Sequence, residues 1–65
     1  MIVVMSPQAK PDSIEKVKER LEAAGLGVHI STGENRTILG VLGDKRKVNI
    51  QAIEVMDDVE KIVHI

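Results

Sequence analysis

The chain is so short that it can form only one domain with a single thin hydrophobic core. It has 65 residues, and chains of about 60 residues bury only about 60% of the surface that they expose when unfolded. Cysteine is absent, so the chain offers no disulfide, thiolate metal site or cysteine nucleophile. Apolar burial or a partner must therefore stabilise the fold.

The composition argues against several classes of partner. Phe, Tyr and Trp are absent, whereas nucleic-acid modules commonly stack bases on aromatic rings. The 9 Lys and Arg residues nearly balance the 10 Asp and Glu residues, so no basic surface for phosphates is expected. The apolar run at residues 2–5 is far shorter than the roughly 20 residues of a membrane-spanning helix, and no basic leader precedes it. We expect a cytoplasmic domain that binds neither nucleic acid nor membrane.

Hydrophobic periodicity predicts a strand and then a helix in the first half of the chain. Residues 2–5 form a largely β-branched run that is apolar on both faces. Asp12 and Glu15 have the spacing of a capping box, with Pro11 just outside the helix. Gly25 follows at the position of a left-handed C-cap. The expected buried stripe of this helix is Ile14, Val17, Leu21 and Ala24.

The second half of the chain predicts two strands, a helix and a last strand. Residues 28–31 alternate apolar and polar, which indicates a strand with one buried face. Residues 37–42 form a second β run, and the two form a hairpin whose register the turn leaves open. Asp44 can cap a helix that begins near Lys45, and residues 59–65 supply the last strand. The expected inner stripe of this helix is Val48, Ala52, Val55 and Met56.

The resulting order, β-α-β-β-α-β, predicts an α+β domain of the ferredoxin-like type over residues 1–65. In this βαββαβ sandwich, both helices cover one face of a four-stranded antiparallel sheet. The other face must meet water or a partner, and both faces of the first and third strands carry aliphatic side chains. One of two opposed sets is therefore expected on the uncovered face: Ile2 and Val4 oppose Val3 and Met5 on the first strand, and Ile38 and Leu42 oppose Leu39 and Val41 on the third.

An exposed apolar patch of this kind usually marks an interaction surface. We therefore expect self-association through the open sheet face, or packing of that face on an adjoining domain. Isolated exposed aliphatic side chains are also common on protein surfaces, which is the simpler alternative.

His29 and Ser31 are the candidate ligand-binding residues. If Val28 and Ile30 face the helices, the alternation of a strand makes His29 and Ser31 project together from the open face. A few hydrogen-bonding groups in an aliphatic field are the usual composition of a small-molecule site. An ordinary solvated face is the alternative interpretation of the same pair.

The remaining candidates have simpler interpretations. His64 has no partner at metal-ligand spacing and is expected to be structural. Asp57 and Asp58 could form an acid/base pair, but neighbouring carboxylates at a helix end more often form a solvated stop. The basic triplet at residues 45–47 is expected to be solvated or to dock an acidic partner. With no catalytic constellation in the sequence, we expect no enzymatic activity, cofactor or metal in this chain.

The central block of the sequence is similar to a known family. It consists of His29-Ile30-Ser31, then Gly33, then residues 36–44 with the sequence RTILGVLGD. This block resembles the N-terminal regulatory domain of type Iβ 3-deoxy-D-arabino-heptulosonate 7-phosphate (DAHP) synthase, whose pattern reads H-I-S-x-G-x-x-R-T-x-[IL]-G-[IV]-[IL]-G-D. The apolar opening and the closing valine-rich strand are similar too, so the resemblance spans nearly the whole chain.

The resemblance implies an ACT-like module that precedes a (β/α)8 barrel. In this family the barrel uses a divalent metal to condense phosphoenolpyruvate with erythrose 4-phosphate, the first step of the shikimate pathway to the aromatic amino acids. The regulatory domains pair on binding an aromatic amino acid, Tyr or Phe, and feedback-inhibit the barrel. The positions that match His29 and Ser31 belong to the ligand site. The resemblance therefore implies an allosteric domain whose partners are the effector, a second copy and the catalytic barrel.

Other functions fit the same strand order less well. A ligand-independent assembly module would use the open face for pairing alone. A protease propeptide would need a substrate-like C-terminal tail, and an RNA-recognition module would need stacking aromatic side chains. Acylphosphatase-like catalysis would need an anion-binding loop after the first strand, which Ser6-Pro7-Gln8 does not resemble.

Overall fold

The expected order of elements is confirmed, with one extra helical turn. The computed structural model describes residues 1–64, apart from the side chain of Lys45. The last residue of the expected final strand, Ile65, lies outside the described residues. The elements are β1 (Ile2–Met5), α1 (Pro11–Ala23), β2 (Gly27–Thr32), β3 (Thr37–Leu42), a 3-10 turn (Lys45–Lys47), α2 (Ile50–Glu54) and β4 (Val59–Val63).

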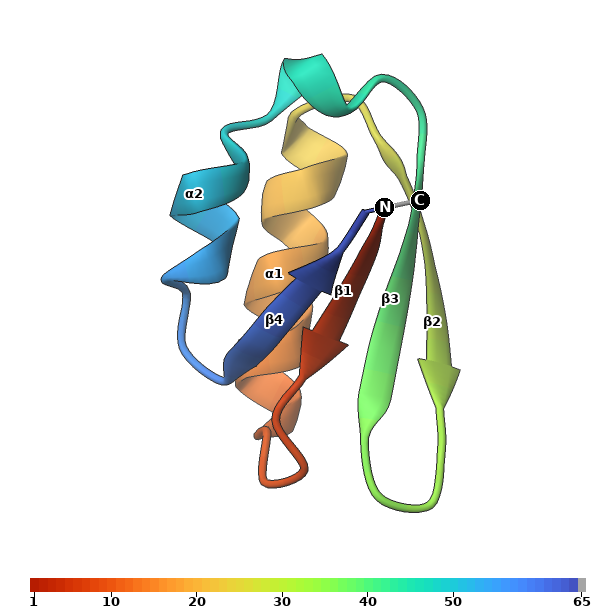
Figure 1. Cartoon of the computed structure of the whole chain (residues 1–65), viewed down its shortest axis with the longest axis vertical. Coiled ribbons are helices and arrows are strands. Elements are labelled where there is room, and N and C mark those ends of the chain that lie inside the picture. The colour runs from red at the N-terminus through yellow and green to blue at the C-terminus, as the bar shows by residue number, and fades with distance from the viewer. Residues whose placement is uncertain (65) are drawn as a thin grey trace.

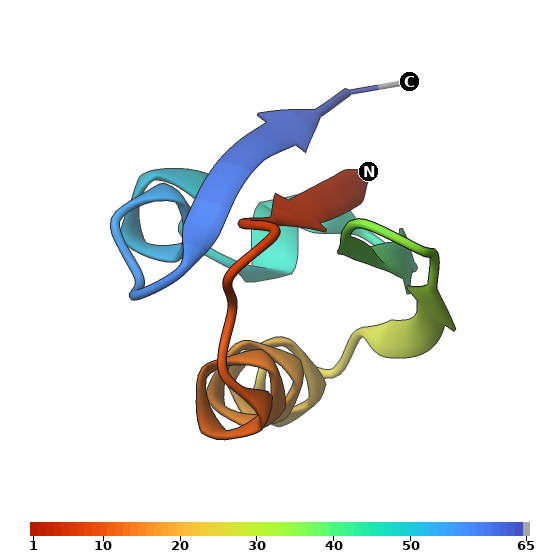
Figure 2. The same ribbon diagram turned by 90° about the horizontal axis from the view of Figure 1, so that it is seen from below.

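The strands form one antiparallel sheet of four, in the order β2-β3-β1-β4. β1, the first strand of the chain, thus lies in the middle of the sheet. Figures 1 and 2 show both helices on the same side of the sheet. The α+β ferredoxin-like βαββαβ fold expected from the sequence is confirmed.

The core lies between the sheet and the helices. Each strand contributes alternate side chains to it, as expected from a pleat with a period of two. Burying one such side chain fully contributes about 1.5–3 kcal/mol. The buried core residues are Val3, Met5, Val17, Leu21, Leu26, Leu39, Val41 and Ile53. Half-buried side chains of the edge strands pack against this core: Val28, Ile30, Val59 and Ile62.

The start of α1 differs from the expected capping box. The helix begins at Pro11, its N-cap residue is Lys10, and no side chain of its own caps it. Proline suits the first helical position because it has no N–H to satisfy there. The backbone N–H of Lys10 donates instead to the carboxylate of Asp58, at 3.1 Å. Asp12 is left in the first turn, where the helix dipole favours a negative charge.

The end of α1 is the one expected. Gly25 has a φ of 86°, a left-handed conformation that glycine adopts without a steric penalty. Its N–H donates to the carbonyl of Glu22 at 2.9 Å, and that of Leu26 donates to Leu21 at 3.2 Å. These two bonds form a Schellman motif, which turns the buried Leu26 into the core.

The expected start of α2 near Lys45 is wrong. The carboxylate of Asp44 accepts the backbone N–H of Arg46 at 3.0 Å and pairs with its guanidinium group at 2.9 Å. This arrangement supports only a single 3-10 turn, and a helix start is unfavourable for three successive cations. The α-helix is capped by Asn49, whose side chain accepts the N–H of Ala52 at 3.3 Å.

Because α2 starts later, the residues that face the core differ from the predicted inner stripe. Ile53 is the fully buried residue of this helix, and Val48 and Met56 pack against the core from either side of it. Val55, expected to face inward, is 82% exposed. No helix within residues 1–64 combines the length and the apolar character needed to cross a membrane.

Candidate functional site

The sheet face that the helices leave uncovered consists of rows of side chains that cross the strands. Residues directly paired in an antiparallel sheet point to the same face, so the strand register defines each row. The three rows are Gly27 and Leu42; His29, Gly40, Ile2 and Val63; and Ser31, Ile38, Val4 and Lys61. We call the surface formed by these rows the open face.

The expected orientation of the β2 side chains is confirmed. Val28 and Ile30 pack against the core, and His29 and Ser31 are exposed in adjacent rows of the open face. Their positions follow from the pairing with Gly40 and Ile38 of β3. That either residue contacts a ligand stays a prediction.

The open face contains a hollow beside His29. Its volume is about 570 Å³, within the roughly 300–1,000 Å³ typical of small-molecule sites. Gly40 lies between His29 and Ile2 in the same row and has no side chain, which leaves space above its backbone. Ser31 lies one row further along. The residues that line the hollow are Met1, Ile2, His29, Gly40, Val41 and Leu42.

The aliphatic part of the open face is narrower than expected. Leu42 is 69% exposed and Val63 is 38% exposed, while Ile2 and Ile38 are half-buried. Val4 points to the open face but is only 6% exposed, so it adds little to the exposed aliphatic surface. It belongs to the central strand, where the neighbouring strands flank it on both sides.

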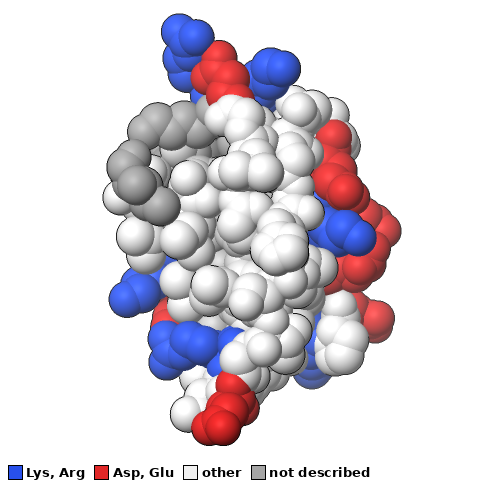
Figure 3. All heavy atoms as spheres, turned by 90° about the vertical axis from the view of Figure 1, so that its right-hand side faces the viewer, with Lys and Arg blue, Asp and Glu red and all other residues white. Residues whose placement is uncertain are grey.

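Charged side chains lie at the margins of this surface. Figure 3, which views the molecule from the side of β2 and β3, shows a central field without Lys, Arg, Asp or Glu and charged groups around it. One ion pair joins the guanidinium group of Arg36 to the carboxylate of Glu60 at 2.5 Å. Arg36 directly precedes β3 and Glu60 belongs to β4, so the pair reaches across the line of β1.

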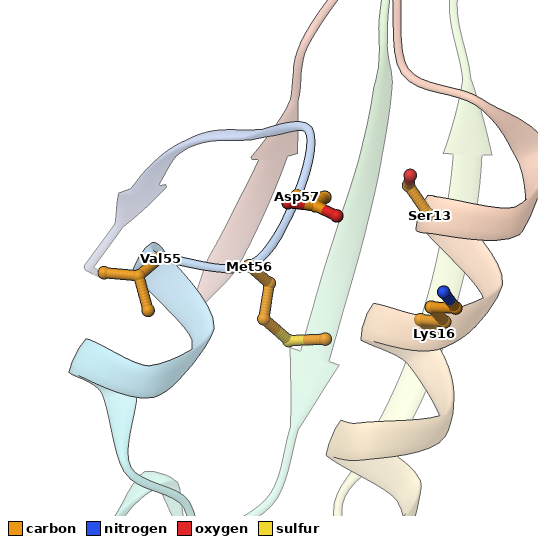
Figure 4. Close-up of a pocket in the computed structure, with 5 residues that line it drawn as sticks. All are labelled: Ser13, Lys16, Val55, Met56 and Asp57. Atoms are coloured by element: carbon orange, nitrogen blue, oxygen red, sulfur yellow. The ribbon is translucent and has the colours of Figure 1, made fainter.

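A second hollow lies on the helix side of the molecule. Figure 4 shows Ser13 and Lys16 on α1 opposite Met56 and Asp57, which follow α2. Its volume is about 250 Å³, and Val55 completes its lining. Its lining carries charges of both signs, unlike that of the open-face hollow.

The structure separates the two neighbouring carboxylates that the sequence placed together. Asp57 lines the second hollow, whereas Asp58 has a φ of 66° and accepts the N–H of Lys10. This hydrogen bond, with help from the Ser13 hydroxyl, lowers the pKa of Asp58 below its ordinary value. Asp58 thus has a structural role at the start of α1.

His64 lies beyond β4 and is exposed. Within residues 1–64, no group of three or more His, Asp or Glu side chains is arranged to hold a metal ion.

Gly40, together with Met1 and Val41, lines the hollow without having been predicted as a site residue. The glycines of a phosphate-binding loop lie between a strand and a helix, whereas Gly40 lies inside β3. Its real signal is its place inside an aliphatic strand, because a glycine there often marks the close approach of a ligand or another backbone.

Comparison with known proteins agrees with the fold and with the central motif. The sequence matches the family described as DAHP synthase ferredoxin-like domain over residues 1–65. It is 40% identical to the phospho-2-dehydro-3-deoxyheptonate aldolase of Thermotoga maritima over 65 residues, which are 100% of this chain and 19% of that protein.

The solved structures give the same result. The crystal structure of phospho-2-dehydro-3-deoxyheptonate aldolase (DAHP synthase) from Thermotoga maritima matches with a TM-score of 0.84 and 40% identity, covering 92% of this chain and 18% of that one. This chain thus spans less than a fifth of the length of these relatives. It belongs to the family of DAHP synthase ferredoxin-like domains.

Proposed function

We propose that residues 1–65 form the allosteric domain of a DAHP synthase. The domain binds tyrosine or phenylalanine on the open face, between two paired copies, and the pairing inhibits the attached catalytic barrel. The observation that carries the proposal is the hollow beside His29 on an otherwise aliphatic and uncharged part of the sheet.

The layout of the open face suits an aromatic side chain. The ring lies in the hollow against Ile2 and Leu42, where its apolar faces lose contact with water. His29 and Ser31 are two residues apart on one strand, about 7 Å, which is comparable with the length of a tyrosine side chain. The imidazole can therefore lie beside the ring while the Ser31 hydroxyl reaches a polar group at the end of the ligand.

Inhibition requires the effector to prefer one arrangement of the domains. A ligand shifts such an equilibrium only by its difference in affinity for the two states, typically 1–3 kcal/mol. A site shared by two copies has this property, because the paired state buries the ligand on both sides.

In this proposal, catalysis and the divalent metal belong to the remainder of the enzyme. The Thermotoga maritima protein is about five times longer than this chain, which matches 19% of it. Deleting residues 1–65 from the whole enzyme should leave DAHP synthesis active and remove its inhibition by tyrosine and phenylalanine. An enzyme that stays sensitive after the deletion would contradict the proposal.

The test on this chain combines sedimentation with thermal unfolding. Tyrosine or phenylalanine should convert monomers into dimers and raise Tm, since a ligand that binds only the folded state stabilises it by mass action. Leucine serves as a non-aromatic control, and His29→Ala should weaken both aromatic ligands. A chain whose mass and Tm do not respond to either aromatic amino acid would contradict effector binding.

A ligand-independent assembly module is the second candidate function. The exposure of Leu42 and Val63 on the open face favours it, because a partner could cover both side chains without any small molecule. In this case the chain forms dimers to the same extent with and without aromatic amino acids.

A further inference from the structure

Gly40 lies inside β3, between a partner in β2 and a partner in β1. A glycine at such a position weakens a strand, because it has high conformational freedom in the unfolded chain and no side chain to pack. Its presence there calls for a reason in the backbone, in the packing or in the surface above it.

Neither the backbone nor the packing requires this glycine. The described glycines with a positive φ are Gly25 and Gly43, so Gly40 has a conformation open to any residue. A Cβ atom at Gly40 would meet the carbonyl oxygen of His29 at 3.7 Å and its Cβ at 4.0 Å, which are ordinary van der Waals distances. At Gly43, by contrast, a Cβ would meet a methyl group of Leu26 at 3.0 Å.

The surface above Gly40 supplies the reason. The bare backbone of Gly40 forms the floor of the open-face hollow, and His29 and Ile2 stand on either side of it. A side chain at this position would point into the hollow, because its neighbours in the row point there too.

A second copy of the chain has no benzene or phenol ring with which to fill this hollow. The sequence contains no Phe, Tyr or Trp, so pairing of two copies can offer only aliphatic, polar or imidazole groups. A benzene or phenol ring, which is larger than imidazole and fits closely against an exposed peptide plane, must come from a separate molecule.

We propose that Gly40 is a specificity-determining residue, on whose bare backbone the ring of an aromatic ligand lies, between His29 and Ile2. This inference rests on the proposed function and assigns the size limit of the site to one residue. A methyl group at Gly40 would occupy the place of the ring. The absence of a side chain there therefore lets the site select ligands by the shape of their ring as well as by hydrogen bonding.

The test compares Gly40→Ala with Gly27→Ala by calorimetry with phenylalanine and tyrosine. Gly27 is a matched control: it lies on the open face, has room for a Cβ at 3.5 Å from Leu42, and does not line the hollow. We expect Gly40→Ala to bind both ligands roughly tenfold more weakly, the usual cost of overpacking a closely fitted site. Gly27→Ala should bind like the unmodified chain, and both variants should keep or raise Tm.

Equal affinities for Gly40→Ala and the unmodified chain would overturn the role of Gly40 and leave the proposed function standing. An unmodified chain that binds neither amino acid would overturn both. A large fall in the Tm of Gly40→Ala would also overturn the inference, because it would show that the fold itself needs the glycine.

A measurement on the unmodified chain avoids any question of folding. Because the chain has no Phe, Tyr or Trp, a bound aromatic ligand would be the main source of new ring-current shifts in its NMR spectrum. Phenylalanine should shift the Hα resonances of Gly40 strongly and those of Gly27 weakly. Ring-current shifts confined to other parts of the chain would overturn the placement.

Discussion

Ser31 and His29 share a face but differ in their surroundings. His29 lines the hollow, and Ser31 lies one row away beside Ile38. In the proposed site the imidazole therefore lies beside the ligand ring, and the hydroxyl is placed to meet a group at the far end of the ligand.

Replacing Ser31 with Gly should narrow the preference for tyrosine over phenylalanine. A buried phenol left without a partner costs about 1–3 kcal/mol, so the loss of the serine hydroxyl should weaken tyrosine and leave phenylalanine nearly unchanged. Calorimetry with both ligands on both chains measures the ratio. An unchanged ratio would exclude Ser31 from ligand discrimination.

Replacing Asp58 with Asn should make the free energy of unfolding depend less on pH in the acid range. The hydrogen bond from Lys10 lowers the pKa of Asp58 from 3.8, so its contribution is present above that value and is lost as the pH falls through the folded-state pKa. Asn tolerates the positive φ but does not titrate. Urea unfolding at a series of pH values should show the two chains converging in acid.

Asp57→Asn is the control for this experiment, because it removes the adjacent carboxylate and leaves the bond to Lys10 in place. Profiles of Asp58→Asn and the unmodified chain that run parallel at every pH would exclude the proposed role of Asp58.

The sequence determines which residues of β2 face outward, because a period of two leaves only one way to bury Val28 and Ile30. It could not reveal that Val4 is covered or that Gly40 forms a floor. Both properties depend on which strands lie next to β1 and β3, which are pairings between distant parts of the chain.

At the level of elements, the sequence predicts well where local signals agree. The bounds of β1 and β3 match the expectation, and the Gly25 C-cap follows from a single residue whose conformation is special. The start of α2 was misplaced because Asp44 and Asn49 are both good caps. The choice between them depends on bringing Ile53 to the core, a tertiary requirement.

Replacing Asn49 with Ala should destabilise the domain by about 1 kcal/mol, a typical cost of losing an N-cap side chain. The effect should be clear because α2 has only five residues and positions a fully buried isoleucine. Denaturant unfolding measures it. Asn35→Ala, in the exposed turn between β2 and β3, should change stability by less than about 0.5 kcal/mol, and an equal effect of the two variants would argue against the cap.

For the whole molecule, the open face offers only a modest gain on pairing. Val4 is already covered, so the remaining gain comes from Leu42, Val63 and the exposed parts of their neighbours. Full burial contributes about 1.5–3 kcal/mol per side chain, and association costs about 4–15 kcal/mol. We therefore expect the domains to pair weakly until a ligand adds contacts of its own.

Replacing Val63 with Lys should prevent this pairing without altering the fold. Val63 lies on the open face but does not line the hollow. The lysine ammonium group would therefore be buried against the second copy, which is unfavourable, and would not touch the ligand. Sedimentation with phenylalanine should detect monomers. Val55→Lys is the matched control, because Val55 lies on the helix side and is 82% exposed. If Val55→Lys lost its dimers and Val63→Lys kept them, the interface would lie on the helix side.

The central place of β1 affects how the domain can form during its synthesis. Its edges are completed by β3 and by β4, and β4 is the last of the four strands of this sheet to leave the ribosome. Until then, one edge of β1 has unpaired backbone groups, and the start of α1 lacks the carboxylate of Asp58. The domain therefore cannot close in stages from its N-terminus, and a nascent chain stalled before Val59 should remain sensitive to proteases.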